Sequence, residues 1–212
     1  QQNTRFRDRN DYRAALGTTM ALRPRWRLLV EATYGHSSYE AGAARATDWD
    51  RFGGNVGFTS KLTERLNGTA KVGYEYWDRS ISTGDTLTAS VALNYALSDR
   101  ISVSLNYSRA ARESVISNEA YTANTGGLRL QYRLGNRRPI TLGLNGNFNY
   151  NEWDRGGEDT YATIGASAAY GFREWCSVVL TYQFDTRDSS RVFGRNWTYT
   201  VNTVTLSAVI GY

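Results

Sequence analysis

One stretch decides the fold of this chain: Leu87-Thr88-Ala89-Ser90-Val91-Ala92-Leu93-Asn94-Tyr95-Ala96-Leu97-Ser98-Asp99-Arg100-Ile101-Ser102-Val103-Ser104-Leu105-Asn106-Tyr107. Apolar and polar residues alternate on both sides of the polar turn Ser98–Arg100. Successive side chains of a β-strand point to opposite faces, so alternation with a period of two marks a strand that has one apolar face. The stretch therefore predicts an antiparallel pair of strands joined by a tight turn.

The same alternation recurs along the whole chain and predicts an all-β protein with eleven strands, or twelve if one is overlooked. Most of these strands have about ten residues, the length that crosses a bilayer at a tilt. Mean hydropathy is only −0.53, as expected if every second residue faces lipid. The apolar sets run over Tyr12–Leu22, Trp26–Tyr34, Phe52–Leu62, Leu66–Tyr76, Leu87–Tyr95, Ile101–Tyr107, Leu128–Leu134, Ile140–Tyr150, Ala162–Phe172, Cys176–Phe184 and Val204–Tyr212.

Short and long connections alternate between these strands. Outer-membrane barrels have short periplasmic turns and longer extracellular loops, so this alternation predicts an up-and-down strand order with all long loops at one end. The short connections are Arg23–Arg25, Thr63–Arg65, Ser98–Arg100, Gly135–Pro139 and Arg173–Trp175. The long ones are Gly35–Arg51, Trp77–Thr86, Ser108–Ala120, Asn151–Thr160 and Asp185–Trp197.

The placement of aromatic residues decides which face meets lipid. Tyrosine, tryptophan and phenylalanine gather at both ends of the apolar sets, while leucine, valine, isoleucine and alanine fill the middle. Aromatic side chains favour the two membrane–water interfaces, so this order predicts a transmembrane antiparallel up-and-down β-barrel. The polar set is rich in serine, threonine and asparagine, which suits an enclosed lumen. A soluble barrel would instead pack Leu105, Leu142 and Leu180 together at its centre.

The hairpin Tyr95–Leu105, its partial copies Leu22–Trp26 and Leu62–Leu66, and the last strand Val204–Tyr212 resemble the bacterial outer-membrane β-barrel family, including its porin-like members. The resemblance implies an outer-membrane location and a lipid bilayer as partner. It also implies recognition of the last strand by the barrel-assembly machinery, through Leu206, Ala208, Ile210 and Tyr212. The family usually ends in phenylalanine, from which Tyr212 departs.

Residues 1–212 are expected to form a single barrel domain in which residues 1–10 are a loop or an N-terminal extension. Barrel strand counts are usually even and both termini usually periplasmic. Eleven strands would place residues 1–10 on the loop side. The sequence therefore predicts either an overlooked strand or the C-terminal part of a longer barrel.

The predicted lumen carries more positive than negative side chains, in a chain whose net charge is +5. One interpretation is a porin-like channel for small polar or anionic solutes or glycans. The other is a wall stiffened by cross-strand ion pairs of Glu31 and Glu75 with neighbouring cations. The lumen-lining positions are Arg13, Arg27, Glu31, Lys61, Lys71, Glu75, Arg129, Arg133, Asn145 and Asn147.

Two other classes compete with the channel. A structural barrel would anchor a surface assembly, a partner protein or a glycan through its loops, with Trp49, Trp153 and Trp197 as contact points or as covers of the mouth. An outer-membrane enzyme would need an activated nucleophile or base. The only histidine is His36, with Ser37, Ser38 and Asp48 near it in sequence. We expect it to be solvated in a loop and predict no enzyme.

No cofactor or metal is expected. The acidic segments Asp48–Asp50 and Asp154–Asp159 could offer oxygens to Ca²⁺, but loops rich in aspartate and glycine are common without it. Cys176 is the only cysteine, which excludes an intrachain disulfide. The positive charge forms no basic run, so a nucleic-acid partner is not expected.

Overall fold

The computed structural model describes residues 9–39, 48–79, 82–114, 119–135, 140–154, 156–173, 175–192 and 195–210. These residues form one antiparallel sheet of eleven strands, in which each strand pairs with its neighbours in sequence. The strands are β1 (Arg9–Arg23), β2 (Trp26–Tyr39), β3 (Trp49–Lys61), β4 (Leu66–Arg79), β5 (Ser82–Ser98), β6 (Ile101–Glu113), β7 (Ala120–Leu134), β8 (Ile140–Trp153), β9 (Glu158–Arg173), β10 (Cys176–Val192) and β11 (Arg195–Ile210). The predicted all-β, up-and-down architecture is thus confirmed. The described part of the chain contains no helix that is long and apolar enough to cross a membrane.

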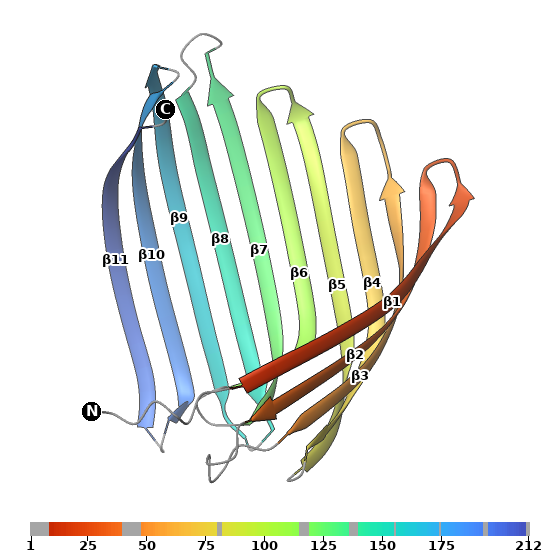
Figure 1. Ribbon diagram of the computed structural model, residues 1–212. Coiled ribbons are helices and arrows are strands. Elements are labelled where there is room, and N and C mark those ends of the chain that lie inside the picture. The colour runs from red at the N-terminus through yellow and green to blue at the C-terminus, as the bar shows by residue number, and fades with distance from the viewer. Residues whose placement is uncertain are drawn as a thin grey trace.

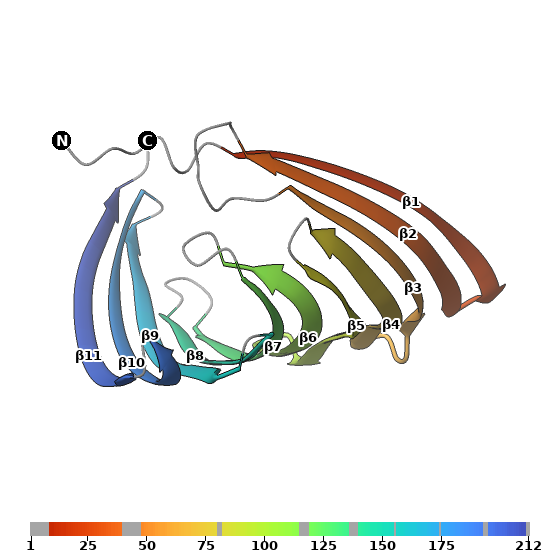
Figure 2. The ribbon, with the colours of Figure 1, turned by 90° about the horizontal axis from the view of Figure 1, so that it is seen from below.

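The sheet is strongly curved and has a concave face. The strand ends next to the short turns lie at its upper end in Figure 1, and the opposite strand ends lie at its lower end. β1 and β11 form the two edges of the curve (Figure 2), and no hydrogen-bond ladder joins them in the described residues. Lipid offers no hydrogen-bond partner to a strand edge, so a closed membrane wall requires a further pairing partner for each of these strands.

The strands are longer than the sequence predicted, with 13 to 17 residues each. Two of the predicted long loops are mostly strand. β4 extends to Arg79 and β5 already begins at Ser82, and likewise β10 extends to Val192 and β11 begins at Arg195. The predicted loop bounds Trp77–Thr86 and Asp185–Trp197 were therefore wrong. Backbone pairing continues beyond the apolar alternation because, outside the lipid, a ladder needs no apolar side chains.

The apolar face points outward. Leu105, Leu142 and Leu180 come from three different strands and are 44%, 39% and 47% exposed, so they do not form a core. Exposed tyrosine, phenylalanine and tryptophan side chains lie toward both ends of the strands, including Tyr34 and Phe52 near the loop end and Trp26 and Phe172 near the turn end. Left in water, each such side chain would cost roughly 1.5–3 kcal/mol. The exposed face matches a membrane barrel and contradicts a soluble one.

In four hairpins, one outer-face tyrosine near the loop end follows the same rule. Each hydroxyl donates to a carboxylate or amide oxygen on the following strand, two residues before the tyrosine's direct cross-strand partner. The pairs are Tyr34 with Asp50, Tyr74 with Asp85, Tyr107 with Asn124 and Tyr182 with Asn202, and in the fifth hairpin Tyr150 and Glu158 have the same offset. A tyrosine side chain with an apolar aromatic ring and a hydrogen-bonded hydroxyl suits the boundary between acyl chains and headgroups.

Candidate functional site

All ten predicted lumen positions share the concave face. Residues directly opposite each other in an antiparallel ladder lie on the same face of the sheet. One such row runs from Lys61 through Asn67, Asn94, Ser104, Arg129 and Asn145 to Gly165. Other rows hold Arg13, Arg27, Glu31, Lys71, Glu75, Arg133 and Asn147. The structure therefore gathers these side chains on one polar surface.

Both predicted acidic residues, Glu31 and Glu75, pair with cations on this surface. Lys71 Nζ lies 3.0 Å from Glu31 Oε2, two strands away. The lysine reaches it across Gly57, where an added Cβ would lie 2.8 Å from Lys71 Cγ. Glu75 lies 3.9 Å from Arg51. By contrast, Arg27, Lys61, Arg129 and Arg133 form no ion pair with any described residue. The concave face therefore holds stiffening pairs and unneutralised cations together.

The ends of β6 and β7 fold inward at the loop end. The ladder between β5 and β6 stops at Ala89 and Arg109, whereas β6 stays paired with β7 up to Glu113. Ala111 and Ala120, on the outer face of this hairpin, form a buried cluster with Trp49 and Trp77 of the concave face. We call this segment, Ala110–Glu113 with Ala120–Ala123, the inward hairpin. It occupies space inside the curve of the sheet.

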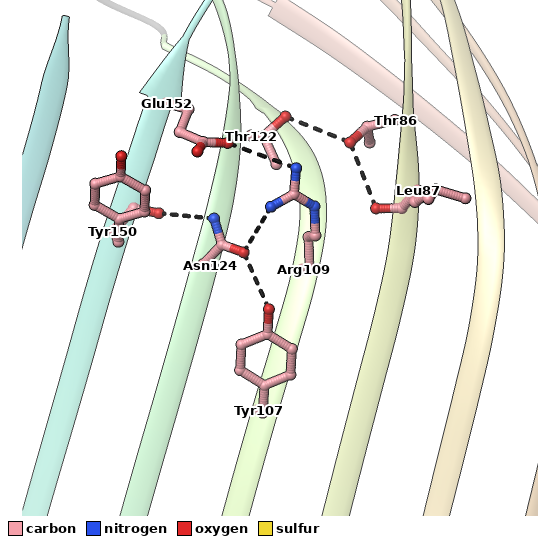
Figure 3. A network of polar contacts seen from close by, with 8 residues as sticks. All are labelled: Thr86, Leu87, Tyr107, Arg109, Thr122, Asn124, Tyr150 and Glu152. Atoms are coloured by element: carbon pink, nitrogen blue, oxygen red, sulfur yellow. Dashed lines mark hydrogen bonds and ion pairs between the residues drawn. The ribbon is translucent and has the colours of Figure 1, made fainter.

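Two polar contacts also tie the inward hairpin to the wall. Arg79 of β4 and Glu113 of β6 lie 3.5 Å apart with side chains only 2% exposed. Thr86 of β5 lies 3.5 Å from Thr122 of β7 (Figure 3). Both contacts join the concave face of β4 and β5 to the outer face of the hairpin. If the hairpin moved away, Arg79 and Glu113 would each become a buried charge without its partner, which is costly. The pair therefore favours the inward position of the hairpin.

Figure 3 also shows a network at the point where β6 leaves β5. Arg109 donates to Asn124 Oδ1 at 3.0 Å and lies 3.5 Å from Glu152. Tyr107 donates to the same Asn124 oxygen, and the Asn124 amide donates to the Tyr150 carbonyl. These contacts connect β6, β7 and β8 on their outer face. The network holds the strands together where β6 loses its partner on the other side.

Arginines gather on the concave face near the inward hairpin. Arg13 of β1 and Arg112 of β6 both act electrostatically on Arg51 of β3, as do the carboxylates of Glu75 and Asp11. The Arg51 guanidinium also lies 4.7 Å from the centre of the Trp49 ring, a favourable cation–π contact. A cavity of about 260 Å³ opens between Arg13, Arg51 and Glu75. This arginine cluster comes from strands that are far apart in the sheet.

Sequence reasoning missed three arginines of the concave face, namely Arg51, Arg112 and Arg187. Each lies within or at the end of a segment predicted as a loop, where the apolar alternation that marks strands is absent. Arg187 forms two hydrogen bonds of 2.8 Å with Asp159. Only the continued polar strands place these side chains on the same surface as Arg13.

The candidate catalytic group around His36 is not assembled as a triad. His36 pairs with Asp50 at 2.9 Å, not with Asp48. Ser37 points to the opposite face of β2, because it is the next residue of the strand, and donates to Asp11. Trp49 is 2% exposed and packs against the inward hairpin, which favours the predicted cover of the mouth over a contact point for a partner.

The remaining predicted positions differ in what the structure describes. The described residues hold no cluster of three metal-ligating side chains. Leu206, Ala208 and Ile210 lie on the exposed outer face of β11. Tyr212 lies outside the described residues, as do residues 1–8.

Comparisons with known proteins agree with this geometry. Residues 1–210 match the family described as "Putative beta-barrel porin 2". Among solved structures, the chain is similar to the outer membrane channel DcaP of Acinetobacter baumannii, with 15% identity, a TM-score of 0.63, and coverage of 93% of this chain and 62% of DcaP. It is also similar to the siderophore receptor PirA of Pseudomonas aeruginosa, with 9% identity, a TM-score of 0.55, and coverage of 94% and 42%. The chain thus spans less than two thirds of the length of either structure. No curated protein matches it.

Proposed function

Because this chain belongs to the beta-barrel porin 2 family of the bacterial outer membrane, we propose that it forms the wall of a non-enzymatic channel for small polar and anionic solutes, glycans included. The arginine cluster, in which Arg13 and Arg51 line one cavity and Arg112 of the inward hairpin acts electrostatically on Arg51, carries this proposal. It lies on the concave face, at the level where the inward hairpin takes up part of the interior.

The charge around the arginine cluster is the reason that we expect anions to be selected there. Glu75 offsets Arg51, whereas Arg13 and Arg112 are exposed and form no ion pair with a described residue. A passage with low-dielectric walls that are lined by one sign of charge concentrates ions of the opposite sign. Serine, threonine and asparagine side chains along the rest of the face offer hydrogen bonds to polar solutes without a strong field of their own.

Ion permeability in planar bilayers tests the proposal. We expect the full-length protein to conduct ions and, under a KCl gradient, to show a reversal potential that favours chloride. Replacing Arg13 and Arg112 together by glutamine should move that potential toward the value of an unselective pore. Arg100→Gln, in the turn between β5 and β6, is the matched control and should leave it unchanged. A folded protein without current, or one selective for cations, would refute the channel.

The two alternatives make different predictions. An anchoring barrel would purify with a stoichiometric partner and carry no current. An enzyme would need a role for His36, whose imidazole pairs with Asp50 on the outer face. A His36→Ala variant that loses a lipid- or peptide-hydrolysing activity of the wild type would favour the enzyme. Recognition of Leu206, Ala208, Ile210 and Tyr212 by the assembly machinery is part of the same proposal. Alanine at Leu206 and Ile210 should slow insertion.

A further inference from the structure

A cavity of about 500 Å³ opens on the concave face near the loop end, over β7 to β11. Arg112 and Tyr121 bound it on the side of the inward hairpin. Its floor is a single cross-strand row, in which the register sets Thr125, Asn149, Tyr161, Arg187 and Tyr199 side by side. We call it the tyrosine cavity. Its volume falls within the range of small-molecule sites.

The charges around the tyrosine cavity do not cancel. Asp159 accepts two hydrogen bonds of 2.8 Å from Arg187, which neutralises that guanidinium. Arg112 is exposed and has no ion-pair partner among the described residues. Glu75 also attracts Arg112, but lies nearer to Arg51, at 3.9 Å. The cavity therefore keeps one cation that can receive a carboxylate.

The rest of the lining combines aromatic faces with open amide groups. Tyr121 packs on Trp153 with ring centres 4.4 Å apart, and Tyr161 donates to Asp185, so both rings are held in place. Asn149 accepts from Thr125, but its amide N–H groups bond to no described residue, and neither does the side chain of Asn151. These amides can both donate and accept.

The geometry points to the tyrosine cavity as a binding subsite for acidic sugars that pass through the channel. In this arrangement Arg112 binds the sugar carboxylate, the amides of Asn149 and Asn151 bind hydroxyls, and a tyrosine ring packs against the C–H face of the sugar. This inference rests on the proposed channel function and adds the solute class.

Two other ligands fit the lining less well. An inorganic anion would use Arg112 but leave the aromatic faces without a partner. An aromatic carboxylate would cover the tyrosine rings but leave the Asn149 and Asn151 amides unpaired. A site built around hydrogen-bonding groups rejects ligands that lack the matching hydroxyls, because its polar groups then lose their partners.

Current interruption by a sugar tests this inference in the full-length protein. We expect trigalacturonate to interrupt the current in a concentration-dependent way, and maltotriose and benzoate to do so weakly or not at all. Asn149→Ala and Tyr199→Ala should each raise the half-blocking concentration about tenfold, the effect of one lost polar or stacking contact. Both leave Arg13 and Arg112 in place, so anion selectivity should not change.

Asn202→Ala is the matched control, because Asn202 lies on the outer face of β11, opposite Phe184, and does not line the cavity. Equal block of the wild type and the Asn149→Ala variant would overturn the subsite, as would stronger block by benzoate. An anion-selective current without trigalacturonate block removes the subsite and leaves the channel standing. If no current is found, titration calorimetry of trigalacturonate with the detergent-solubilised protein decides the subsite by itself, with absence of binding as the refuting result.

Discussion

The two ends of β6 follow different rules. From Ile101 to Arg109 the strand is paired on both sides, with β5 and with β7. From Ala110 to Glu113 it is paired with β7 alone, and its outer face packs on the concave face of β3 and β4. Within lipid, an unpaired backbone group has no alternative partner, so the sheet must stay continuous. Beyond the lipid, water and side chains can replace the ladder, and a hairpin is free to turn inward.

The difference also changes what holds each end. The lipid-facing end is held by the backbone ladder and by contact of its apolar face with acyl chains. The loop end is held by particular side chains: Trp49, Trp77, and the pair of Arg79 with Glu113. Substitutions should therefore separate the two regions.

The largest effect is expected at the base of the inward hairpin. Trp77→Ala removes a side chain that is only 3% exposed, and a buried tryptophan cut to alanine typically costs about 3–5 kcal/mol. The loss should release the hairpin and raise single-channel conductance. Denaturant unfolding and bilayer recordings measure the two effects. Trp197→Ala is the control, because Trp197 is 57% exposed. If the two variants had the same unfolding free energy and conductance, Trp77 would not be what holds the inward hairpin in place.

A charge on the outer face should come next. Leu105→Arg places a cation against acyl chains, at a cost of about 2–4 kcal/mol near the middle of the bilayer. The neighbouring substitution Ser104→Arg adds the same side chain to the concave face and should cost much less. Unfolding in lipid vesicles compares the two variants. If Ser104→Arg were the more harmful, the assignment of the two faces would be reversed.

The wall of β2 to β4 should respond less strongly. At Gly57, an added Cβ would lie 2.3 Å from the Ala70 carbonyl oxygen and 2.8 Å from Lys71 Cγ, so Gly57→Ala displaces the lysine from Glu31. Overpacking of this kind costs about 1–3 kcal/mol. Gly54→Ala, on the same strand, is the control, since no heavy atom beyond Gly54 and its two chain neighbours lies within 4 Å of its added Cβ. Equal unfolding midpoints for both variants would contradict the crossing of Lys71 over Gly57.

The smallest effect is expected for the tyrosine hydroxyls near the loop end of the outer face. Tyr74→Phe removes the hydroxyl that donates to Asp85, and a hydrogen bond of this kind contributes about 0.5–1.5 kcal/mol. Tyr76→Phe is the control, because the Tyr76 hydroxyl bonds to no described residue. Unfolding free energies in vesicles should differ between the variants. Identical unfolding free energies would show that the hydrogen bond from the Tyr74 hydroxyl to Asp85 does not stabilise the protein.

The concave face was predictable only where alternation marked a strand. Arg13, Lys71 and Glu75 were found because the alternating apolar neighbours fix their face. Arg51, Arg112 and Arg187 were missed, because they lie where strands continue without apolar side chains. Lipid imposes the alternation of apolar and polar residues. This alternation therefore stops near the loop-end tyrosines of the outer face, although the hydrogen-bonded strands continue beyond them.

The sequence by itself determined the all-β class, the up-and-down strand order, the outward direction of the apolar face and the aromatic boundaries. Each of these depends on local alternation and on the solvent that meets each face. The tertiary structure alone decided the inward hairpin, the pairing of Arg79 with Glu113, and the cavity that Arg13 and Arg51 share. These contacts join strands that are neither neighbours in the sheet nor close in sequence, so no local pattern of residues encodes them.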